Sequence, residues 1–579
     1  MLARLFPKLD RLTRPTGHLG HESKIATSDN GSADAALPFP DLGLLGNEAT
    51  IRKYVWGFVW IGIAARAVRY FLCFPLWEDE CFVCYNLIDR SYAELLQPLD
   101  YHQVAPILFL WAQLTVVKLL GFSEWTLRLI PFACGIGSVF LFRRVASRML
   151  TGLPLVFAVA VFAVSYPGIR YAAEAKPYGT DLFVGLAMLA MFLEWRHAPQ
   201  KTKWLWAMVA AAPVAIGISY PAAFVCGGLS VAVAFCNMRD DSPGRTRWIA
   251  WTSFNVAMLG AFGLTYWLAA ANQRSSELDF MQNYWGNAFP PLNSLTDFLG
   301  WFALAHTSDL LAYPVGGGRG ASAFTFLCCV AAGAVLVRKR RWLLLSLAGL
   351  PLLLNLIASA MHRYPYGGHV KFAQYHAAMI TIVAGIGLAV IVQAHAKWIP
   401  KRAKLGAQMA CAILALIAIC SMGRDIISPY KSTTDMRHRA FAQWFWFNTE
   451  FQGETVCLTS DLDVRFSRET YEDLSWSAMY LCNQHIYSPR HAAGEPPEWD
   501  RVANDWPLRC VLFRAPRFDF DEDAKAQWLR EMQTSYTLTG VAEYPFPCFG
   551  KREREAINVD YVEVFTFVPH VSAPLATKE

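Results

Sequence analysis

Long apolar runs limit what this 579-residue chain can fold into more than any single motif does. A membrane-spanning helix needs about 20 consecutive apolar residues. The chain is 54% hydrophobic and only 17% charged, against about 25% charged for an average soluble domain. The sequence therefore predicts a mainly α-helical, polytopic membrane bundle with about eleven crossings, at 54–74, 124–147, 151–168, 178–195, 203–219, 222–237, 248–271, 321–337, 342–361, 373–396 and 404–422.

Basic clusters predict how the spans are oriented, because Lys and Arg near span ends stay on the cytoplasmic side. Five clusters of Lys and Arg follow the first span. If Arg52 and Lys53 lie inside, the first span ends outside. All five clusters are then cytoplasmic only if an odd number of crossings separates residue 75 from Arg143. The apolar run 104–120 is then not a full crossing. We expect it, and the similar run 297–313, to be interfacial helices at the outer face.

The remaining sequence divides around this bundle. Residues 1–50 are polar and predict a disordered cytoplasmic tail, 51–425 form the membrane module, and 430–579 form a small extracytoplasmic α/β domain. The resulting localisation is a multi-pass protein of the cytoplasmic (inner) membrane with its C-terminal domain outside. The residue patterns in that domain are helix-like at 434–449 and 521–534, and strand-like at 454–460, 508–514, 537–545 and 561–568.

The charge and cysteine counts add little by themselves. Lys and Arg number 52 against 46 Asp and Glu, a net charge of +6 that is too small to argue for a nucleic-acid partner. Most cysteines lie in apolar runs, where they pack as small hydrophobes. Four lie in the polar C-terminal part and could pair in an oxidising compartment: Cys457, Cys482, Cys510 and Cys548.

Three consecutive carboxylates, Glu78, Asp79 and Glu80, follow the first span directly after Trp77. Like charges and desolvation both raise a carboxyl pKa, so one of the three could serve as a general base near neutral pH. The alternative is a solvated acidic start of a loop. The nearby pair Cys81 and Cys84 is interpreted as packing.

Two further outer segments carry ionisable side chains. His102 precedes the interfacial run, where it is either an anion-facing residue or a helix cap. Arg170, Glu174 and Asp181 are spaced by four and seven residues and would share one helical face, either as a site or as charges that pair within a loop. Asp181 lies just inside an apolar run, and such carboxylates usually face the bundle interior.

Basic residues at the outer face suggest an anion. Arg66 and Arg69 lie one turn apart in the outer half of the first span, where an unpaired Arg is costly. We expect their partners to be the carboxylates of 78–80 or a lipid phosphate. In the last outer loop, Arg363, His369 and Lys371 would meet an anion at headgroup level, with ordinary lipid contact as the alternative.

The order of five short motifs resembles the GT-C membrane glycosyltransferases that use polyprenyl-phosphate sugars, a class that includes protein O-mannosyltransferases and the lipid A aminoarabinose transferase. The resemblance covers about 54–420. The first Pro of the family's H-P-P-L-like segment is replaced here, which weakens the role of His102. The motifs are Asp79-Glu80, 102–106 leading into 108–110, 121–129 with Arg128, 171–181, and Arg363-Tyr364.

The resemblance implies a mechanism. Asp79 would be the general base that deprotonates a hydroxyl or amine acceptor as it attacks the anomeric carbon with inversion, and Glu80 would position the acceptor or the base. The leaving lipid phosphate needs fixed cations, for which Arg363 and Lys371 are the candidates, supported by Arg66 or Arg69. Glu174 and Asp181 would hold the sugar or a divalent metal ion, and the other candidate substrate-binding residues are His102, Arg170, Tyr171, Lys176 and His369.

Three functions remain open at this point. The first is a glycosyltransferase with a polyprenyl-phosphate-linked sugar donor and a glycan, lipid or protein acceptor. The second is a transporter or flippase of lipid-linked saccharides, and the third a non-catalytic membrane assembly protein. Transporters usually place ionisable groups near the bilayer midplane, whereas here the spans from 124 to 271 have uncharged middles and the charges gather at one face. That distribution favours the transferase.

Overall fold

A computed structural model describes most of the chain. The described residues are 44–240, 243–272, 284–316, 321–398, 403–448, 453–458, 471–488, 507–514, 522–545 and 561–570. Residues 1–43 of the predicted tail 1–50, as well as Cys548, lie outside them, and α2 begins at Glu48 within that predicted tail. The predicted fold class is confirmed, because the chain is a mainly helical, multi-pass membrane bundle followed by a small α/β domain.

Each of the predicted spans coincides with a helix. Six stretches within the described residues are long and apolar enough to cross a membrane, and the bent pair formed by α6 and the turn after it would give a seventh. The crossing number and the orientation stay predictions. The helices are α2 (Glu48–Phe71), α5 (Glu124–Met149), α6 (Gly152–Val164), α8 (Tyr178–His197), α9 (Lys203–Ile218), α10 (Ala222–Arg239), α11 (Arg245–Asn272), α14 (Ala321–Arg338), α15 (Trp342–Ala360), α16 (Ala377–Trp398) and α17 (Ala403–Ile427).

The two runs predicted to be interfacial form the short helices α4 (Ile107–Leu120) and α13 (Leu295–Ser308). Each has 14 residues and is therefore about 21 Å long, less than the ~30 Å apolar core of a bilayer. Short helical turns connect the long helices near the site, namely α3 (Glu78–Cys84), α7 (Tyr166–Arg170), η4 (Tyr171–Ala173) and η6 (Val370–His376).

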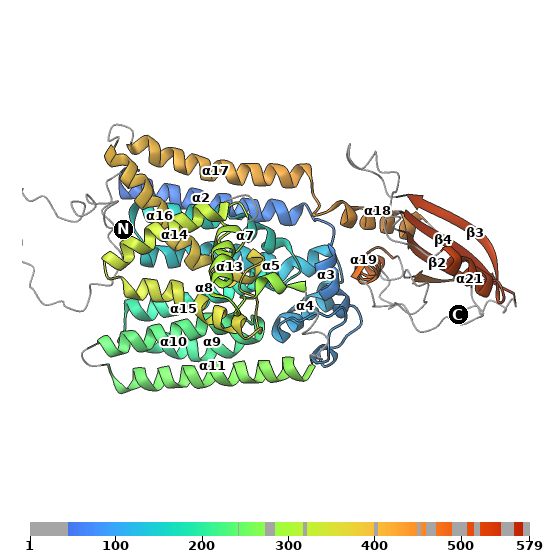
Figure 1. Cartoon of the computed structure of the whole chain (residues 1–579), viewed down its shortest axis with the longest axis horizontal. Helices are drawn as coiled ribbons and strands as arrows, with labels where there is room; N and C mark the ends of the chain where they lie inside the picture. Colours follow the sequence, from blue (N-terminus) through green and yellow to red (C-terminus); the bar gives the residue numbers. More distant parts are fainter. Residues whose placement is uncertain are drawn as a thin grey trace, which may run out of the picture. The chain divides into compact units, whose positions relative to one another are not determined.

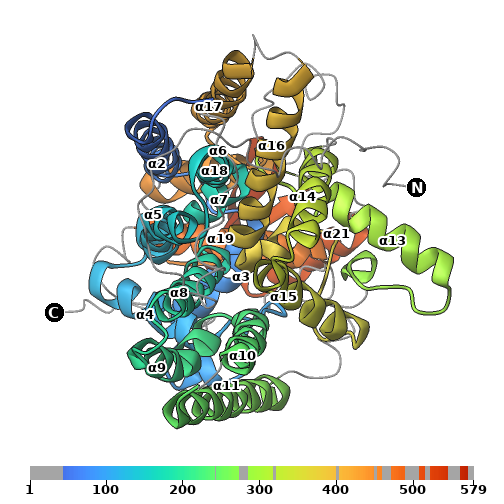
Figure 2. The same cartoon turned by 90° about the vertical axis from the view of Figure 1, so that its left-hand side faces the viewer.

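Helix α6 lies at the centre of the bundle, with α2, α16 and α17 packed around it (Figure 2). Its sequence is apolar on every side, and all but one of its residues are buried, as expected of a helix with no polar face. Close packing needs glycine here. A Cβ at Gly385 of α16 would lie 2.4 Å from the backbone nitrogen of Ala158.

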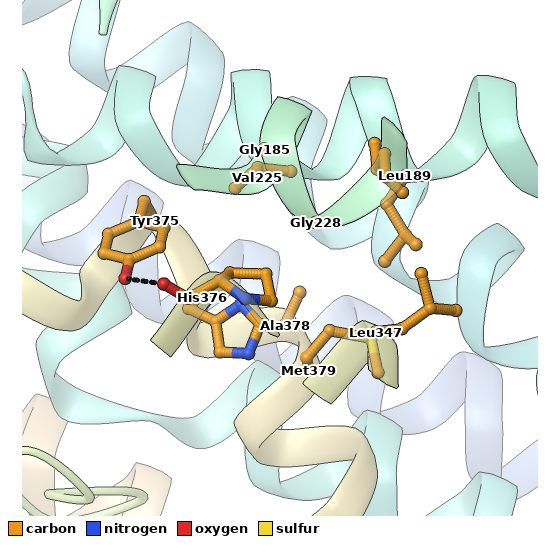
Figure 3. Close-up of a pocket in the computed structure, with 11 residues that line it drawn as sticks. Gly185, Leu189, Val225, Gly228, Leu347, Tyr375, His376, Ala378 and Met379 are labelled. Carbon is orange, nitrogen blue, oxygen red and sulfur yellow. Dashed lines mark hydrogen bonds between the residues drawn. The ribbon is translucent and has the colours of Figure 1, made fainter. Parts of the chain in front are cut away.

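A small apolar cavity lies between α8, α10, α15 and η6–α16 (Figure 3). Gly185 and Gly228 leave the space, and His376 lines it with its Nε2 2.8 Å from the carbonyl oxygen of Ala348. Nε2 donates this bond, so the ring has a partner within the bundle. The cavity is part of helix packing.

The C-terminal domain has one four-stranded sheet in the order β1-β2-β4-β3. Strands β1 (Glu454–Leu458) and β2 (Leu508–Arg514) are parallel, and β4 (Tyr561–Pro569) pairs antiparallel with β2 and with β3 (Tyr536–Pro545). All four predicted strands are confirmed, as are the predicted helices, now α18 (Thr433–Asn448) and α21 (Glu522–Met532). Helix α19 (Tyr471–Tyr487) was not predicted.

Helices α18 and α19 attach this domain to one end of the bundle (Figure 1). Ser475 donates to the Glu78 carboxylate at 2.7 Å, and Cys482 and Met479 of α19 share an apolar core with Cys81 and Cys84 of α3. Cys81 and Cys84 are buried, free thiols, which supports their interpretation as packing. Cys482 and Cys510 are free as well.

Candidate functional site

Helix α3 places the three sequence carboxylates in different surroundings. The chain leaves α2 through the segment around Pro75, and α3 begins at Glu78 with all three carboxylates in its first turn, where acidic residues stabilise the helix dipole. Successive helical residues point about 100° apart. Glu78 therefore faces α19, Glu80 faces the bundle, and Asp79 lies between them.

Glu80 is a structural anchor. Its side chain is 1% exposed and forms an ion pair with Arg128 of α5, in which Arg128 Nε lies 2.7 Å from Oε1. The backbone N–H of Ala175 donates to the same oxygen at 2.7 Å. Arg128 also donates to the carbonyl oxygens of Phe74 and Pro75. Glu80 thus joins α3, α5 and the segment before α8, and it can position the base but has no free surface for an acceptor.

Asp79 is the carboxylate that remains accessible, with 20% of its side chain exposed. Its Oδ1 lies 2.8 Å from Lys176 Nζ and its Oδ2 3.6 Å from Lys371 Nζ. Lys176 Nζ also donates to Gln103 Oε1 at 2.9 Å. The structure therefore brings together three segments that are far apart in the sequence.

The pKa expectation for this carboxylate is wrong. Burial acts to raise the pKa of Asp79, but the ammonium groups of Lys176 and Lys371 outweigh it and hold the pKa well below its usual value. The neighbouring carboxylates and Trp77 are adjacent to Asp79 in the sequence, whereas the two lysines come from loops about 100 and 300 residues away. Asp79 is ionised throughout the physiological pH range.

A second pair closes the other side of the site. Arg170 pairs with Glu174 at the predicted spacing of four residues. Burial acts to raise the pKa of Glu174, but Arg170 and Lys431 together lower it below its usual value. Tyr171 lies with its hydroxyl 3.3 Å from His369 Nδ1. Burial, reinforced by Lys371, lowers the pKa of His369 to about 3, so the imidazole is neutral and is no part of the positive charge.

Aromatic rings surround the lysines. Lys371 Nζ lies 4.5 Å from the ring centre of Trp285 and 5.7 Å from that of Tyr178. Lys431, from the segment between α17 and α18, lies with its ammonium over the ring of Trp77. Cations over aromatic faces are held without a carboxylate partner. They keep positive charge available for an anionic ligand.

The carboxylates of 78–80, one of the two partners expected for Arg66 and Arg69, are wrong, and the lipid phosphate stays a prediction. Arg69 pairs with Asp425 of α17 at 2.8 Å. Arg66 is fully buried and donates to the carbonyl oxygens of Gly62 and Ala163 at 2.9 and 3.0 Å. Both arginines therefore hold helices together within the bundle, and neither pairs with the carboxylates of α3.

The other predicted residues lie apart from Asp79. Asp181 does not lie on one helical face with Arg170 and Glu174, because Pro177 separates α8 from the helical turns before it. The Asp181 side chain is buried in α8 near Ser219 and Tyr364. Arg363 is exposed, with its guanidinium 6.0 Å from the ring centre of Tyr266. His102 is half-buried at a left-handed turn with φ +50°, and its neighbour Gln103 is the side chain that reaches Lys176.

The donor set does not suit a divalent metal. The described residues contain no group of three or more His, Cys, Asp or Glu side chains that could hold one. Asp79 and Glu174 each face cations, and Asp181 lies in a separate, buried environment. The possible metal ion implied by the family resemblance therefore has no set of ligands in this part of the chain.

Comparisons with known proteins concern the fold. No family model matches the chain, and no curated protein does. Among solved structures, ArnT from Cupriavidus metallidurans, bound to undecaprenyl phosphate, aligns at 13% identity over 88% of this chain and 98% of its own, with a TM-score of 0.49. The Archaeoglobus fulgidus oligosaccharyltransferase in the apo form aligns at 11% identity over 88% and 75%, with a TM-score of 0.45. Both have the GT-C fold, and this likeness assigns no substrate to the present chain.

Replacing Lys176 by Met should change the pH dependence of any reaction that uses the Asp79 carboxylate. With one ammonium removed, burial dominates and the pKa of Asp79 rises, so the normalised activity of Lys176→Met should fall between about pH 7 and pH 5. The unmodified protein should show no such fall from this group. The measurement is consumption of donor lipid in membranes across that pH range.

The control is Lys118→Met, which removes an exposed lysine that lies over the ring of Tyr92, away from Asp79. Its pH profile should follow that of the unmodified protein. Identical profiles for Lys176→Met and Lys118→Met would show that Lys176 does not control Asp79.

Proposed function

We propose that this chain is an inverting glycosyltransferase that moves a sugar from a polyprenyl-phosphate-linked donor to a hydroxyl or amine acceptor at the outer face of the inner membrane. One observation carries the proposal. The partly exposed carboxylate of Asp79 lies between two lysine ammonium groups at the end of a membrane bundle. A reaction that deprotonates one group while a phosphate leaves needs a base and cations together.

Asp79 receives the acceptor proton in this proposal. The acceptor oxygen or nitrogen forms a bond to the anomeric carbon, and the bond between that carbon and the phosphate oxygen breaks with its electron pair on the phosphate. A donor phosphate near Lys176 and Lys371 would compete with Asp79 for their charge. The carboxylate would then become more basic when the donor is bound, which couples proton removal to donor binding.

The motif order supports the same function. Four of the five motifs that resemble GT-C enzymes contribute to the cluster: Asp79, Gln103 in the second motif, Arg128 in the third, and Lys176 in the fourth. The loop after Arg363 supplies Lys371. The acceptor class, glycan, lipid or protein, follows from neither motif nor geometry.

Mass spectrometry of cells with and without the chain tests the proposal. Its removal should cause one polyprenyl-phosphate sugar to accumulate and one sugar to disappear from a glycan, lipid or protein. A flippase would give a similar pattern, so the second arm uses the purified chain in detergent, where membrane sidedness is lost. Transfer from the accumulated lipid to extracted acceptor supports a transferase; donor that stays intact there excludes one.

A further inference from the structure

The segment between the last membrane helix and the C-terminal domain enters the candidate site. Helix α17 ends at Ile427 and α18 begins at Thr433, and Lys431 lies between them with its ammonium over Trp77. Trp77 directly precedes the carboxylates of α3. None of the sequence motifs extends to this segment, so Lys431 is absent from the predicted site.

The position of Lys431 is set by α18. Asp435 is 1% exposed and accepts hydrogen bonds from the backbone N–H groups of Lys431 and Ser432, at 3.2 Å and at 3.0 and 3.1 Å. Helix α18 is in turn fixed to the bundle, since Arg439 donates to the Cys73 carbonyl oxygen at 2.9 Å and pairs with Glu124 at 3.0 Å. The segment is therefore held at both ends.

The charge of the cluster gives Lys431 a role. Lys431 adds one positive charge to a cluster that otherwise holds the cations Lys176, Lys371 and Arg170 and the carboxylates Asp79 and Glu174, and Asp435 also faces Lys431. His369 is neutral. A lipid phosphodiester carries one negative charge, and a phosphate monoester carries nearly two at neutral pH. The one positive charge of Lys431 therefore corresponds to the roughly one negative charge that the phosphate gains on going from diester to monoester.

We propose that Lys431 binds the lipid phosphate group as it changes from a diester into a monoester, and supplies the positive charge that the product requires. This inference rests on the proposed function. When the bond from the anomeric carbon to the phosphate oxygen breaks, the phosphate gains the second negative charge, and the acceptor proton passes to Asp79. An ammonium group used for the product charge stabilises the transition state more than the bound donor.

The titration of Lys431 agrees with this role. Desolvation at the site lowers the pKa of Lys431 to about 7, and Arg170 acts in the same direction, although the residue keeps an exposed surface. Glu174, Asp79 and Asp435 act in the opposite direction. Near neutral pH the free ammonium is therefore partly deprotonated. A phosphate dianion would restore the charge, so its binding should weaken as the pH rises above 7.

The test measures binding to the full chain in phosphatidylcholine nanodiscs. The probes are undecaprenyl phosphate, a monoester, and phosphatidylglycerol, a diester. At pH 7, Lys431→Met should weaken undecaprenyl phosphate binding by about 10- to 100-fold, the range of a hydrogen bond to a charged group, and phosphatidylglycerol binding by less than about twofold. Lys118→Met should change neither, and inorganic phosphate should compete if the phosphate group alone is recognised.

The pH dependence distinguishes an effect of the Lys431 charge from a structural effect of the substitution. Between pH 7 and pH 9 the unmodified protein should lose about 10- to 30-fold in affinity for undecaprenyl phosphate, whereas Lys431→Arg should stay nearly constant because guanidinium remains charged. Equal losses for both probes in Lys431→Met, or equal pH dependence in Lys431→Arg, would overturn the inference. If the unmodified protein does not bind undecaprenyl phosphate at all, the proposed function itself fails.

Discussion

Replacing Asp79 by Asn should lower sugar transfer by at least about 10³-fold, because the amide cannot accept the acceptor proton; general-base catalysis contributes about 10²–10⁴-fold. The substitution is nearly isosteric, and the side chain is partly exposed, so folding should be retained. It also removes a negative charge beside Lys176 and Lys371. Binding of undecaprenyl phosphate should therefore become tighter while transfer is lost.

The informative result is that undecaprenyl phosphate binding becomes tighter while sugar transfer is lost. Donor consumption and undecaprenyl phosphate binding are measured on the same nanodisc preparation, with Asp89→Asn as the control. Asp89 is an exposed carboxylate beyond α3 on the same outer segment, and its replacement should alter neither quantity. Transfer at an unchanged rate in Asp79→Asn would remove Asp79 from the role of base.

Replacing Arg128 by Met should destabilise the fold by about 3–5 kcal/mol, because it leaves the buried Glu80 carboxylate without its counter-ion. Glu80 and Arg128 are 1% and 3% exposed, and Arg128 also satisfies two backbone carbonyl groups. Thermal unfolding of the purified chain measures the loss. The same substitution at Arg144, which is 56% exposed and pairs with Glu194, should cost less than about 1 kcal/mol.

The variant Glu80→Gln combined with Arg128→Met separates pairing from packing. If the loss in Arg128→Met arises from an unpaired buried charge, removing that charge as well should recover part of the stability. A double variant that is as unstable as the sum of the two single variants would mean that the two side chains stabilise the bundle independently.

The sequence predicted the elements well because their signals are local. Span length and apolar content define helices such as α15 and α16, and a short run rich in Val and Phe defines β4. Helix α19 was missed because its buried side chains meet both α3 and the sheet, which removes a single clear apolar face. Residues with a partner four positions away, such as Arg170 and Glu174, were also predicted as a possible pair.

The site was predicted in part, and the features that were missed depend on contacts between residues far apart in the sequence. The sequence singled out Asp79, Lys176 and Lys371, but assigned Asp79 the wrong direction of pKa change because the two lysines approach it only in the fold. Glu80 and Asp79 are adjacent in the sequence and differ only in which helical direction they face. Gln103 and Lys431 carry no recognisable local signal, since their significance depends on Lys176 and Trp77.

The pair between Arg69 and Asp425 has a consequence for biogenesis. The two residues lie 356 positions apart, in α2 near the start of the described chain and in α17 at the end of the membrane bundle. At about 5–20 residues per second, a ribosome needs roughly 20–70 s to add that length. During this interval the newly inserted α2 carries an arginine without its carboxylate, at a cost of about 2.5–3.5 kcal/mol if it lies deep in the bilayer. Insertion machinery, water or lipid headgroups must therefore shelter α2 until synthesis of α17 completes the bundle, and Asp425→Asn should prolong the residence of the nascent chain in that state.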